Sequence, residues 1–506
     1  MPTEQTSRRL LVARLLSLGV LAGTLVLVFS RTMQRVLDHD EHQFVASAAL
    51  WAREGLLPYR DFPHFHMPYL VFVYGLLDNL TEQLFLAARA VSVLAAWSTL
   101  LLVHRALKKS VDVGRPFVRH GLACAGVLLL LFNPLFTYTS GLAWNHDLAV
   151  VLVLAAVLIH TRGAGAPLLV GILLGFAIGV RLSVAPLAAP FLLSYRLNGT
   201  PGARLAPALR FLAGMAFALL PAGLLALAAP EQAVFDNLGY PATNTAYRVD
   251  EGFARAMDLP GKLDYIVTDV AAQPGNLLLL LLFFYGMTRP GHVRATIEGR
   301  RRQFVLLLVP FLLFGALAPT PSWYQYFYAL VPFAILGAVV GLTPIPSTSR
   351  ATPFAWVFVG LTVLAGAWQS LPDYRTLSNL TNPASWAPNR ARAVGEQVVA
   401  AAGDGVVLTL APIYVVEAGG AIDPVFTSGS FQWRSAPFLD AEERALYGLV
   451  GPAELDAHLA AHPPAALLCG TEKRGEEPLV DWARRHGFQE LDLGGGLQLF
   501  VPSDGR

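Results

Sequence analysis

The chain has 506 residues, of which 54% are hydrophobic and 14% charged, and its mean hydropathy is +0.50. A composition this apolar excludes an ordinary soluble globular protein and is typical of a multi-span membrane protein. The net charge of +2 gives no reason to expect a nucleic-acid partner, and two cysteines, Cys124 and Cys469, are too few for a disulfide framework and are interpreted as inert fillers.

Apolar runs of roughly span length continue to about Gln369, beyond which charge returns and the runs shorten. This shift predicts a transmembrane domain over residues 1–370, a linker over 371–389 and a soluble α/β domain over 390–506. At the start of the chain, three arginines surround an apolar run from Leu10 to Phe29. A cleaved signal peptide begins in a similar way, but the run is long and no small-x-small cleavage site follows, which favours a retained signal anchor.

The positively charged segments set the expected topology, because cytoplasmic loops collect lysine and arginine. Such segments lie at the N-terminus and at residues 104–120, 195–210 and 288–302, and we place all of them inside the cell. This placement predicts about eleven transmembrane helices, or about 12–13 if the segment 67–103 crosses twice instead of once. The N-terminus is then cytoplasmic and the C-terminal domain extracytoplasmic, in a multi-pass protein of the cell (inner) membrane.

The outer face receives the segments that carry candidate chemistry, although none of them was used to set the topology. These segments are the first outer loop 31–66, the second large outer loop 231–274, Asn145–Asp147, Arg181 and the aromatic turn Trp323–Tyr328.

Three acids, Asp38, Asp40 and Glu41, begin the first outer loop. They are either a solvated loop or a catalytic cluster. Apolar residues at helical spacing within Glu41–Gly55 predict a helix in the plane of the membrane interface, which would hold the acids beside the bilayer. A carboxylate in that place can deprotonate an acceptor hydroxyl or amine, and adjacent acids favour protonation of one or recruitment of a cation. Asp40 and Glu41 are therefore candidate catalytic residues.

The rest of the first loop contains three prolines within Pro58–Pro68, which exclude a regular helix. His64 and His66 would share a face on an extended segment. They are interpreted as a metal pair, as hydrogen-bonding groups for a phosphate or a sugar, or as ordinary interface residues.

Two polar groups mark the outer ends of later spans. Asp147 opens an apolar run and serves either as a helix cap, as Asn145 would, or as a second acid of the site. Arg181 has ten apolar-rich residues on each side, and an arginine at depth costs roughly 2.5–3.5 kcal/mol on insertion scales. It is expected either to extend to the membrane surface or to bind a phosphate at the outer leaflet.

The aromatic turn Trp323–Tyr328 is typical of an interfacial aromatic belt. Alternatively, it forms a platform for an isoprenoid chain or a sugar ring, with Tyr324 and Gln325 donating hydrogen bonds.

Helix and strand patterns alternate in the C-terminal segment, which predicts a small α/β domain. Strands are expected in Asp404–Pro412, Pro464–Gly470 and Leu497–Pro502, and the glycines before the last strand are interpreted as a turn. The loop Asp423–Arg434 could reach back over the membrane site.

In order along the chain, these features resemble the GT-C glycosyltransferases, in the branch that contains protein O-mannosyltransferases and lipid A aminoarabinose transferases. The pattern consists of an N-terminal span, Asp40–Glu41, "REGLLPYRDF" at Arg53–Phe62, Asp147 at the start of a later span, and "GFAIGVR" ending at Arg181, followed by the aromatic turn. The resemblance covers most of the transmembrane domain.

The resemblance implies transfer of a hexose or pentose from a polyprenyl-phosphate carrier, usually with inversion, to an acceptor on the outer face. Asp40 or Glu41 would be the base, and Arg181 would bind the donor phosphate. This chain has His66, Arg181 and Gln325 where relatives often carry lysine or histidine. Metal dependence differs within the superfamily, so a divalent cation (Mg²⁺ or Mn²⁺) held by Asp40 and Asp147 is an open expectation.

The acceptor classes left open are a lipid-linked glycan, a cell-envelope polysaccharide, a lipid and a protein. The alternative functions are a lipid or sugar transporter or flippase without transferase chemistry, and a non-catalytic assembly protein. Against a transporter, the sequence shows no repeated halves, and its acids gather on one face instead of at mid-bilayer.

Overall fold

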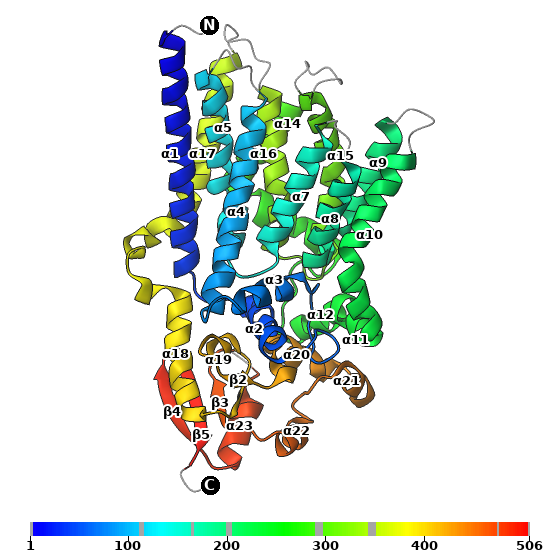
Figure 1. The fold of residues 1–506 in the computed structure, drawn as a ribbon, viewed down its shortest axis with the longest axis vertical. Helices are drawn as coiled ribbons and strands as arrows, with labels where there is room; N and C mark the ends of the chain where they lie inside the picture. The colour runs from blue at the N-terminus through cyan, green and yellow to red at the C-terminus, as the bar shows by residue number, and fades with distance from the viewer. Residues whose placement is uncertain are drawn as a thin grey trace.

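A computed structural model describes residues 4–110, 116–162, 166–198, 205–288, 297–342, 351–472 and 475–503. Figure 1 shows a long helical bundle with a smaller α/β domain at one end, and the N-terminus lies at the opposite end from the C-terminus. The bundle consists of α1 (Glu4–Gln34), α4 (Leu84–Lys108), α5 (Pro116–Leu131), α7 (His146–His160), α8 (Pro167–Val180), α9 (Ala188–Asn198), α10 (Leu205–Ala228), α14 (Pro274–Thr288), α15 (Ile297–Leu317), α16 (Val331–Leu342) and α17 (Ala351–Tyr374).

Within the described ranges, four helices, α1, α4, α10 and α17, are each long and apolar enough to cross a membrane. The bent pair 259–271 and 274–288 would be a fifth if it forms one span, and several other bundle helices are apolar but shorter. The polytopic helical architecture is thereby confirmed, whereas the number of crossings stays a prediction. Parts of the basic segments, at residues 111–115, 199–204 and 289–296, lie outside the described residues.

The first outer loop and the start of the segment 67–103 fold into two short helices at the end of the bundle that faces the α/β domain (Figure 1). Helix α2 (His39–Glu54) begins at a capping box, in which Asp38 accepts from the Asp40 N–H and Glu41 accepts from the Asp38 N–H. It ends at Gly55, whose φ is 72°. Helix α3 (Tyr69–Asp78) has 10 residues and stays beside α2, whereas α4 runs along the bundle.

Helix α2 is present where the sequence predicted a helix, and protein covers much of it. All ten residues from Glu41 to Leu50 are buried, because α3 covers one side and the C-terminal domain another. One hydrophobic cluster joins Phe44 of α2 to Val407 and Ile413 of that domain.

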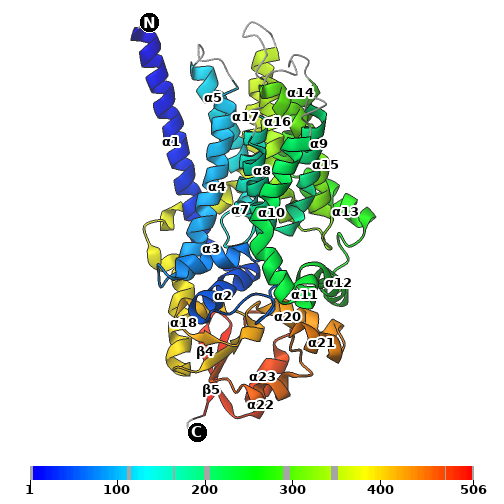
Figure 2. The same cartoon turned by 45° about the vertical axis from the view of Figure 1, so that its right-hand side comes forward.

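The second outer loop, for which the sequence predicted only a long polar segment, is largely helical. It contains α11 (Pro230–Val234), a π-helical turn η2 (Phe235–Gly239), α12 (Tyr240–Asp250), α13 (Leu259–Tyr265) and η3 (Ile266–Ala271). Its aromatic residues gain partners that its sequence does not reveal, since Phe235 stacks on Tyr447 of the C-terminal domain at 4.0 Å. Figure 2 shows α11 and α12 beside α20 and α21.

The C-terminal domain contains a sheet of order β2-β1-β3-β5-β4, in which β1 is parallel to β2 and β3, and β5 is antiparallel to β3 and β4. The three expected strands are β1 (Val406–Thr409), β3 (Ala466–Cys469) and β5 (Leu497–Pro502), and β2 (Ala421–Ile422) and β4 (Phe488–Gly494) were missed. The expected glycine turn joins β4 to β5. The α-helices of the C-terminal domain are α18 (Ala387–Ala402), α19 (Ile413–Glu417), α20 (Ser430–Ser435), α21 (Ala441–Tyr447), α22 (Leu455–Ala461) and α23 (Glu477–Arg485).

Candidate active site

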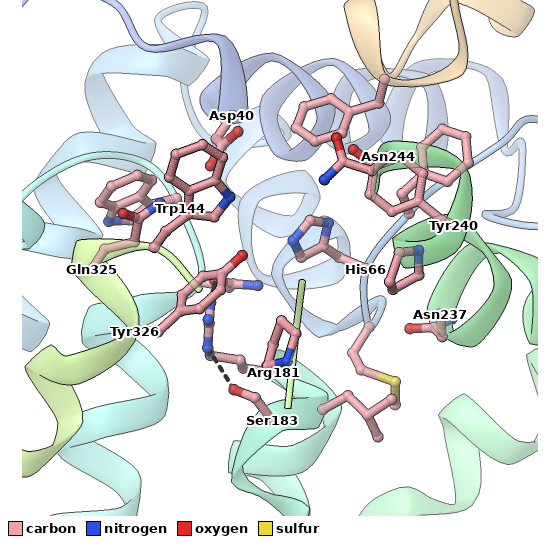
Figure 3. A pocket seen from close by; sticks show the side chains of 18 of the residues that line it. Asp40, His66, Trp144, Arg181, Ser183, Asn237, Tyr240, Asn244, Gln325 and Tyr326 are labelled. Atoms are coloured by element: carbon pink, nitrogen blue, oxygen red, sulfur yellow. Dashed lines mark hydrogen bonds between the residues drawn. The ribbon is translucent and has the colours of Figure 1, made fainter. Parts of the chain in front are cut away.

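A cleft lies where the bundle, the two outer loops and the C-terminal domain meet (Figure 3). It has about 1270 Å³ of empty volume, including space open to solvent. Widely separated segments line it: the start of α2, the turn at Phe65–Met67, the ends of α7 and α8, the second outer loop, the aromatic turn and α20. The residues singled out from the sequence that line this cleft are Asp38, Asp40, His66, Asn145, Arg181, Trp323 and Gln325.

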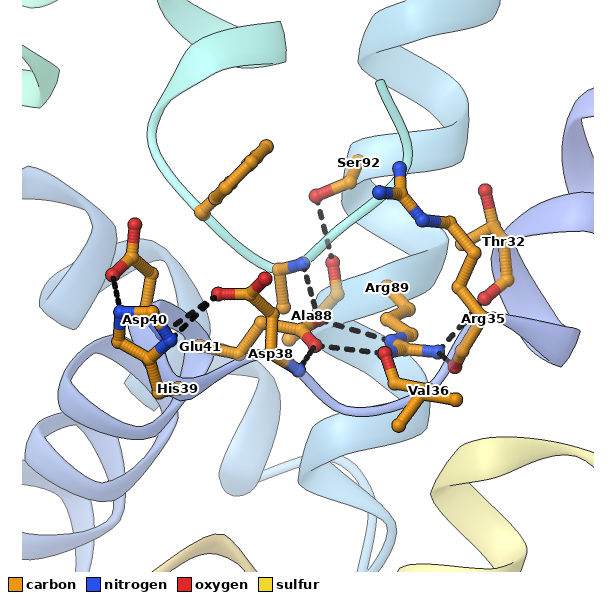
Figure 4. A network of polar contacts seen from close by, with 12 residues as sticks. Thr32, Arg35, Val36, Asp38, His39, Asp40, Glu41, Ala88, Arg89 and Ser92 are labelled. Carbon is orange, nitrogen blue, oxygen red and sulfur yellow. Dashed lines mark hydrogen bonds and ion pairs between the residues drawn. The ribbon is translucent and has the colours of Figure 1, made fainter. Parts of the chain in front are cut away.

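Asp40 stands in the first turn of α2, and its side chain is 25% exposed. The imidazole Nε2 of His39 lies 3.1 Å from its Oδ1. Asp38 lies on the other side of His39 (Figure 4). Burial, and then the charge of Asp40, raise the pKa of Asp38. The capping box fixes the start of the helix, so Asp40 is held on rigid backbone at the wall of the cleft.

Glu41, the next residue, is fully buried and does not line the cleft. Its carboxylate receives Nε and Nη2 of Arg89 at 3.0 and 2.7 Å, as Figure 4 shows. It also accepts the N–H groups of Ala143 at 2.7 Å and Asp38 at 2.9 Å. These four hydrogen bonds occupy the lone pairs that a base would need. The geometry therefore indicates that Glu41 stabilises the structure and is not the base.

Arg181 ends α8, where the chain leaves the helix in an extended conformation. Its Nη1 donates to Asn145 Oδ1 at 2.7 Å, and its Nε donates to Ser183 Oγ at 2.8 Å. The guanidinium carbon lies 4.8 Å from the centre of the Tyr326 ring. The arginine therefore stays at the cleft, oriented by neutral groups, and its positive charge is left for a ligand.

The two histidines of the first loop have different environments. His66 lines the cleft and shares a 3.0 Å hydrogen bond with Gln43, and burial lowers its pKa well below the usual value. His64 is fully buried, its Nδ1 pairs with Ser47 Oγ at 3.1 Å, and burial lowers its pKa to about 3. They do not share a face, because the chain turns between them with the His66 N–H bonded to the His64 carbonyl.

Asp147 and Tyr324 also lie outside the residues that line the cleft. Asp147 is fully buried and accepts the Gly141 N–H at 2.7 Å and the Tyr328 hydroxyl at 3.1 Å. Gly141 has a φ of 97°, and a Cβ there would lie 2.0 Å from Thr32 of α1, so only glycine suits this turn. Asp147 therefore holds the loop that carries Asn145. The Tyr324 hydroxyl accepts a hydrogen bond from the Asn276 amide at 3.1 Å.

The carboxylates of Asp40 and Asp147 are not brought to one place on the cleft wall. Among the described residues, the group that could hold a metal ion is Asp38, His39 and Asp40, whose ligand atoms lie within 4.8 Å of one another.

Several residues of the cleft were not anticipated from the sequence. The second outer loop contributes Asp236, Tyr240, Asn244 and Arg248, and a helical polar segment of ordinary composition carries no signal for them. Arg248 lies over the Trp323 ring at 5.2 Å. The C-terminal domain contributes Phe431, from the loop that was expected to reach back over the site.

The chain shares its fold with ArnT, a protein of known structure. The crystal structure of ArnT from Cupriavidus metallidurans bound to undecaprenyl phosphate aligns with a TM-score of 0.62 over 96% of this chain and 98% of that chain, at 12% identity. The apo state of the same protein aligns with a TM-score of 0.61 over 97% and 98%, at 14% identity. At these identities the similarity establishes the fold.

The archaeal oligosaccharyltransferase AglB from Archaeoglobus fulgidus, in complex with an inhibitory peptide and a dolichol-phosphate, aligns with a TM-score of 0.49 over 96% of this chain and 74% of that chain, at 12% identity. That score is too low to support a conclusion about this chain. No family model and no curated protein matches the sequence.

Proposed function

We propose that this protein is a membrane glycosyltransferase that moves a sugar from a polyprenyl-phosphate donor to an acceptor on the outer face of the cell (inner) membrane. One observation carries the proposal: Asp40, from the start of the chain, and Arg181, more than a hundred residues later, line the same cleft. The shared fold with ArnT, whose crystal structure holds undecaprenyl phosphate, supports this class of donor.

In the proposed reaction, Arg181 binds the phosphate of the donor, since a guanidinium pairs well with phosphate oxygens. Asp40 accepts the proton of an acceptor hydroxyl or amine as its oxygen or nitrogen attacks the anomeric carbon. The bond from the anomeric carbon to the phosphate oxygen breaks, and the polyprenyl phosphate leaves with its negative charge held by Arg181. Attack from the face opposite the phosphate inverts the anomeric configuration.

The proposal assigns the base to Asp40 alone, because Glu41 is committed to Arg89. A divalent cation would fit Asp38 and Asp40, since carboxylate oxygens are the ligands that Mg²⁺ prefers. No step above depends on that cation, and a comparison of transfer in chelator with transfer in added Mg²⁺ or Mn²⁺ tests the requirement.

The test is transfer by the purified chain in liposomes, supplied with radiolabelled polyprenyl-phosphate hexoses or pentoses and with glycan, lipid and peptide acceptors. Asp40→Asn should lower the rate about 10²- to 10⁴-fold, the usual contribution of a general base. Arg181→Gln should weaken donor binding. Asp373→Asn, an exposed acid at the end of α17, is the matched control and should leave the rate unchanged.

Transfer that survives Asp40→Asn would contradict the assigned base. Flipping of the donor across the liposome membrane with no transfer to any acceptor would favour a flippase instead.

A further inference from the structure

Asp236 is a carboxyl group of the cleft for which the reaction above has no use. It belongs to the π-helical turn η2, a rare element that occurs often at functional sites. The side chain is 1% exposed and lies at the wall of the cleft. Its Oδ2 accepts the His64 N–H at 2.8 Å, whereas its Oδ1 is buried without a hydrogen-bond partner in the described part of the chain.

No salt bridge joins Asp236 to a lysine, arginine or histidine among the residues that the structure describes. Helix α12, which packs against η2, carries the titratable groups Tyr240, Tyr247, Arg248 and Asp250. Arg248 lies over the rings of Tyr247 and Trp323, and the causes that shift the pKa of Asp236 are burial and the His64 N–H. The other titratable side chains around η2 are Tyr59, His64, His66, Tyr447 and Glu231.

Burial raises the pKa of Asp236 to about 8, and the His64 N–H offsets only part of that shift. The carboxyl group is therefore mostly protonated at neutral pH. A protonated carboxyl group has an O–H to donate, and an unpartnered oxygen at a cleft wall is where that O–H would find its acceptor in a bound molecule.

We propose that Asp236 is a specificity-determining residue that donates a hydrogen bond, as a neutral carboxylic acid, to an oxygen of the sugar being transferred. This inference rests on the proposed function and extends it. Figure 3 shows Asn237, Tyr240 and Asn244 on one side of the cleft, across from Asp40 and Gln325. The amides and phenols on this side suit hydroxyl and ring oxygens better than a phosphate, the Arg248 guanidinium of the same loop lies over the Trp323 ring, and Arg181 serves the phosphate.

The competing explanation is structural: Asp236 only holds the His64 N–H and thereby the loop that carries His66. Asp236→Asn separates the two, because asparagine keeps the oxygen for the His64 N–H and carries an N–H donor that does not ionise. Asp264→Asn, an exposed acid of the same outer loop, is the matched control.

The experiment measures transfer from subsaturating donor across pH 6 to 10. The wild type should lose rate as pH rises through about 8, because the carboxylate form has no proton to donate. Asp236→Asn should stay flat over that interval, and the Asp264→Asn profile should follow the wild type. Asp236→Ala should be about tenfold slower than the wild type below pH 8, the size of one hydrogen bond to substrate, and the difference should narrow above pH 8, where the wild type has lost its donor as well.

Infrared difference spectra of wild type minus Asp236→Asn give a second readout that needs no turnover. They should show the carbonyl stretch of a protonated carboxyl group at pH 7, fading above about pH 8. Absence of this band, or an alkaline decline that Asp236→Asn retains, would overturn the inference while transfer and its dependence on Asp40 stand. A wild type that transfers no sugar would overturn the proposed function, and the sugar contact with it.

Discussion

At the scale of single residues, two neighbouring acids have opposite environments. Asp40 and Glu41 are consecutive on a helix, so their side chains point about 100° apart. Asp40 meets the cleft and Glu41 meets Arg89 inside the protein. The sequence predicted that acids would gather here, but it could not distinguish them, because the partner that removes Glu41 from the cleft lies 48 residues away on α4.

Glu41→Gln should destabilise the fold by about 3–5 kcal/mol, because it leaves the buried guanidinium of Arg89 without its counter-charge. Asp40→Asn should change stability by about 0.5 kcal/mol or less, since its side chain is partly exposed and makes no buried pair. Thermal unfolding in detergent measures both. A Glu41→Gln variant that unfolds like the wild type but transfers no sugar would return Glu41 to the list of catalytic groups.

At the scale of elements, local pattern predicted the helices and strands that carry their own signals, such as α2 with its apolar residues at helical spacing and the β4–β5 turn with its glycines. It missed the folding of the second outer loop. The reason is physical: η2 and α12 are ordered by partners such as Tyr447 and Phe431, which lie about two hundred residues further along the chain. A single-sequence pattern records local preference and not such partners.

One element joins the two domains through a helix end. Glu417, at the end of α19, accepts the Phe85 N–H at 2.6 Å in the first turn of α4, and burial raises its pKa to about 7. Glu417→Ala should cost about 1 kcal/mol, the usual loss for a helix cap, and should expose the segment between α17 and α18 to protease. Glu396→Ala, at an exposed residue of α18, is the control. Equal digestion of the two variants would show that the Glu417–Phe85 hydrogen bond does not hold the two domains together.

The same carboxyl group gives the docking a pH dependence with a definite sign. The pKa of Glu417 is higher in the folded chain than its ordinary value of 4.5, so the folded state binds the proton more tightly. Stability from this group is therefore lost as pH rises from about 4.5 to about 7. Glu417→Gln, which keeps an acceptor oxygen for Phe85, should remove that slope in thermal unfolding measured across this interval.

At the scale of the whole molecule, the cleft is complete only when the C-terminal domain is docked. The centroid of the Phe431 ring lies within 6.4 Å of the ring centroids of Phe65, His66 and Tyr240. Phe431 therefore joins the C-terminal domain to both outer loops. Hydropathy and the charge of the loops were sufficient to predict a multi-span membrane protein, and the fold shared with ArnT agrees with that prediction. The hydrogen bond between Asp236 and the first outer loop could not be predicted, because nothing in the sequence of either segment points to the other.

Phe431→Leu should lower transfer several-fold while costing less than about 1.5 kcal/mol, because leucine fills similar apolar space but cannot reproduce the ring contacts. Phe438→Leu, at a partly exposed site of the same domain, should have the wild-type rate. Initial rates compared with unfolding temperatures separate the two effects. Equal rates for both variants would show that the domain covers the cleft without shaping it.

The order of these segments along the chain has a consequence for biosynthesis. A nascent polypeptide inserted as far as α17 already holds Asp40, Arg181 and Asp236, yet α2 is still uncovered and Phe431 has not been made. The ribosome-bound intermediate therefore presents an unfinished cavity to the lipids around it. Folding of the last hundred or so residues completes the wall, so the proposed donor site can form only after the C-terminal domain has been made.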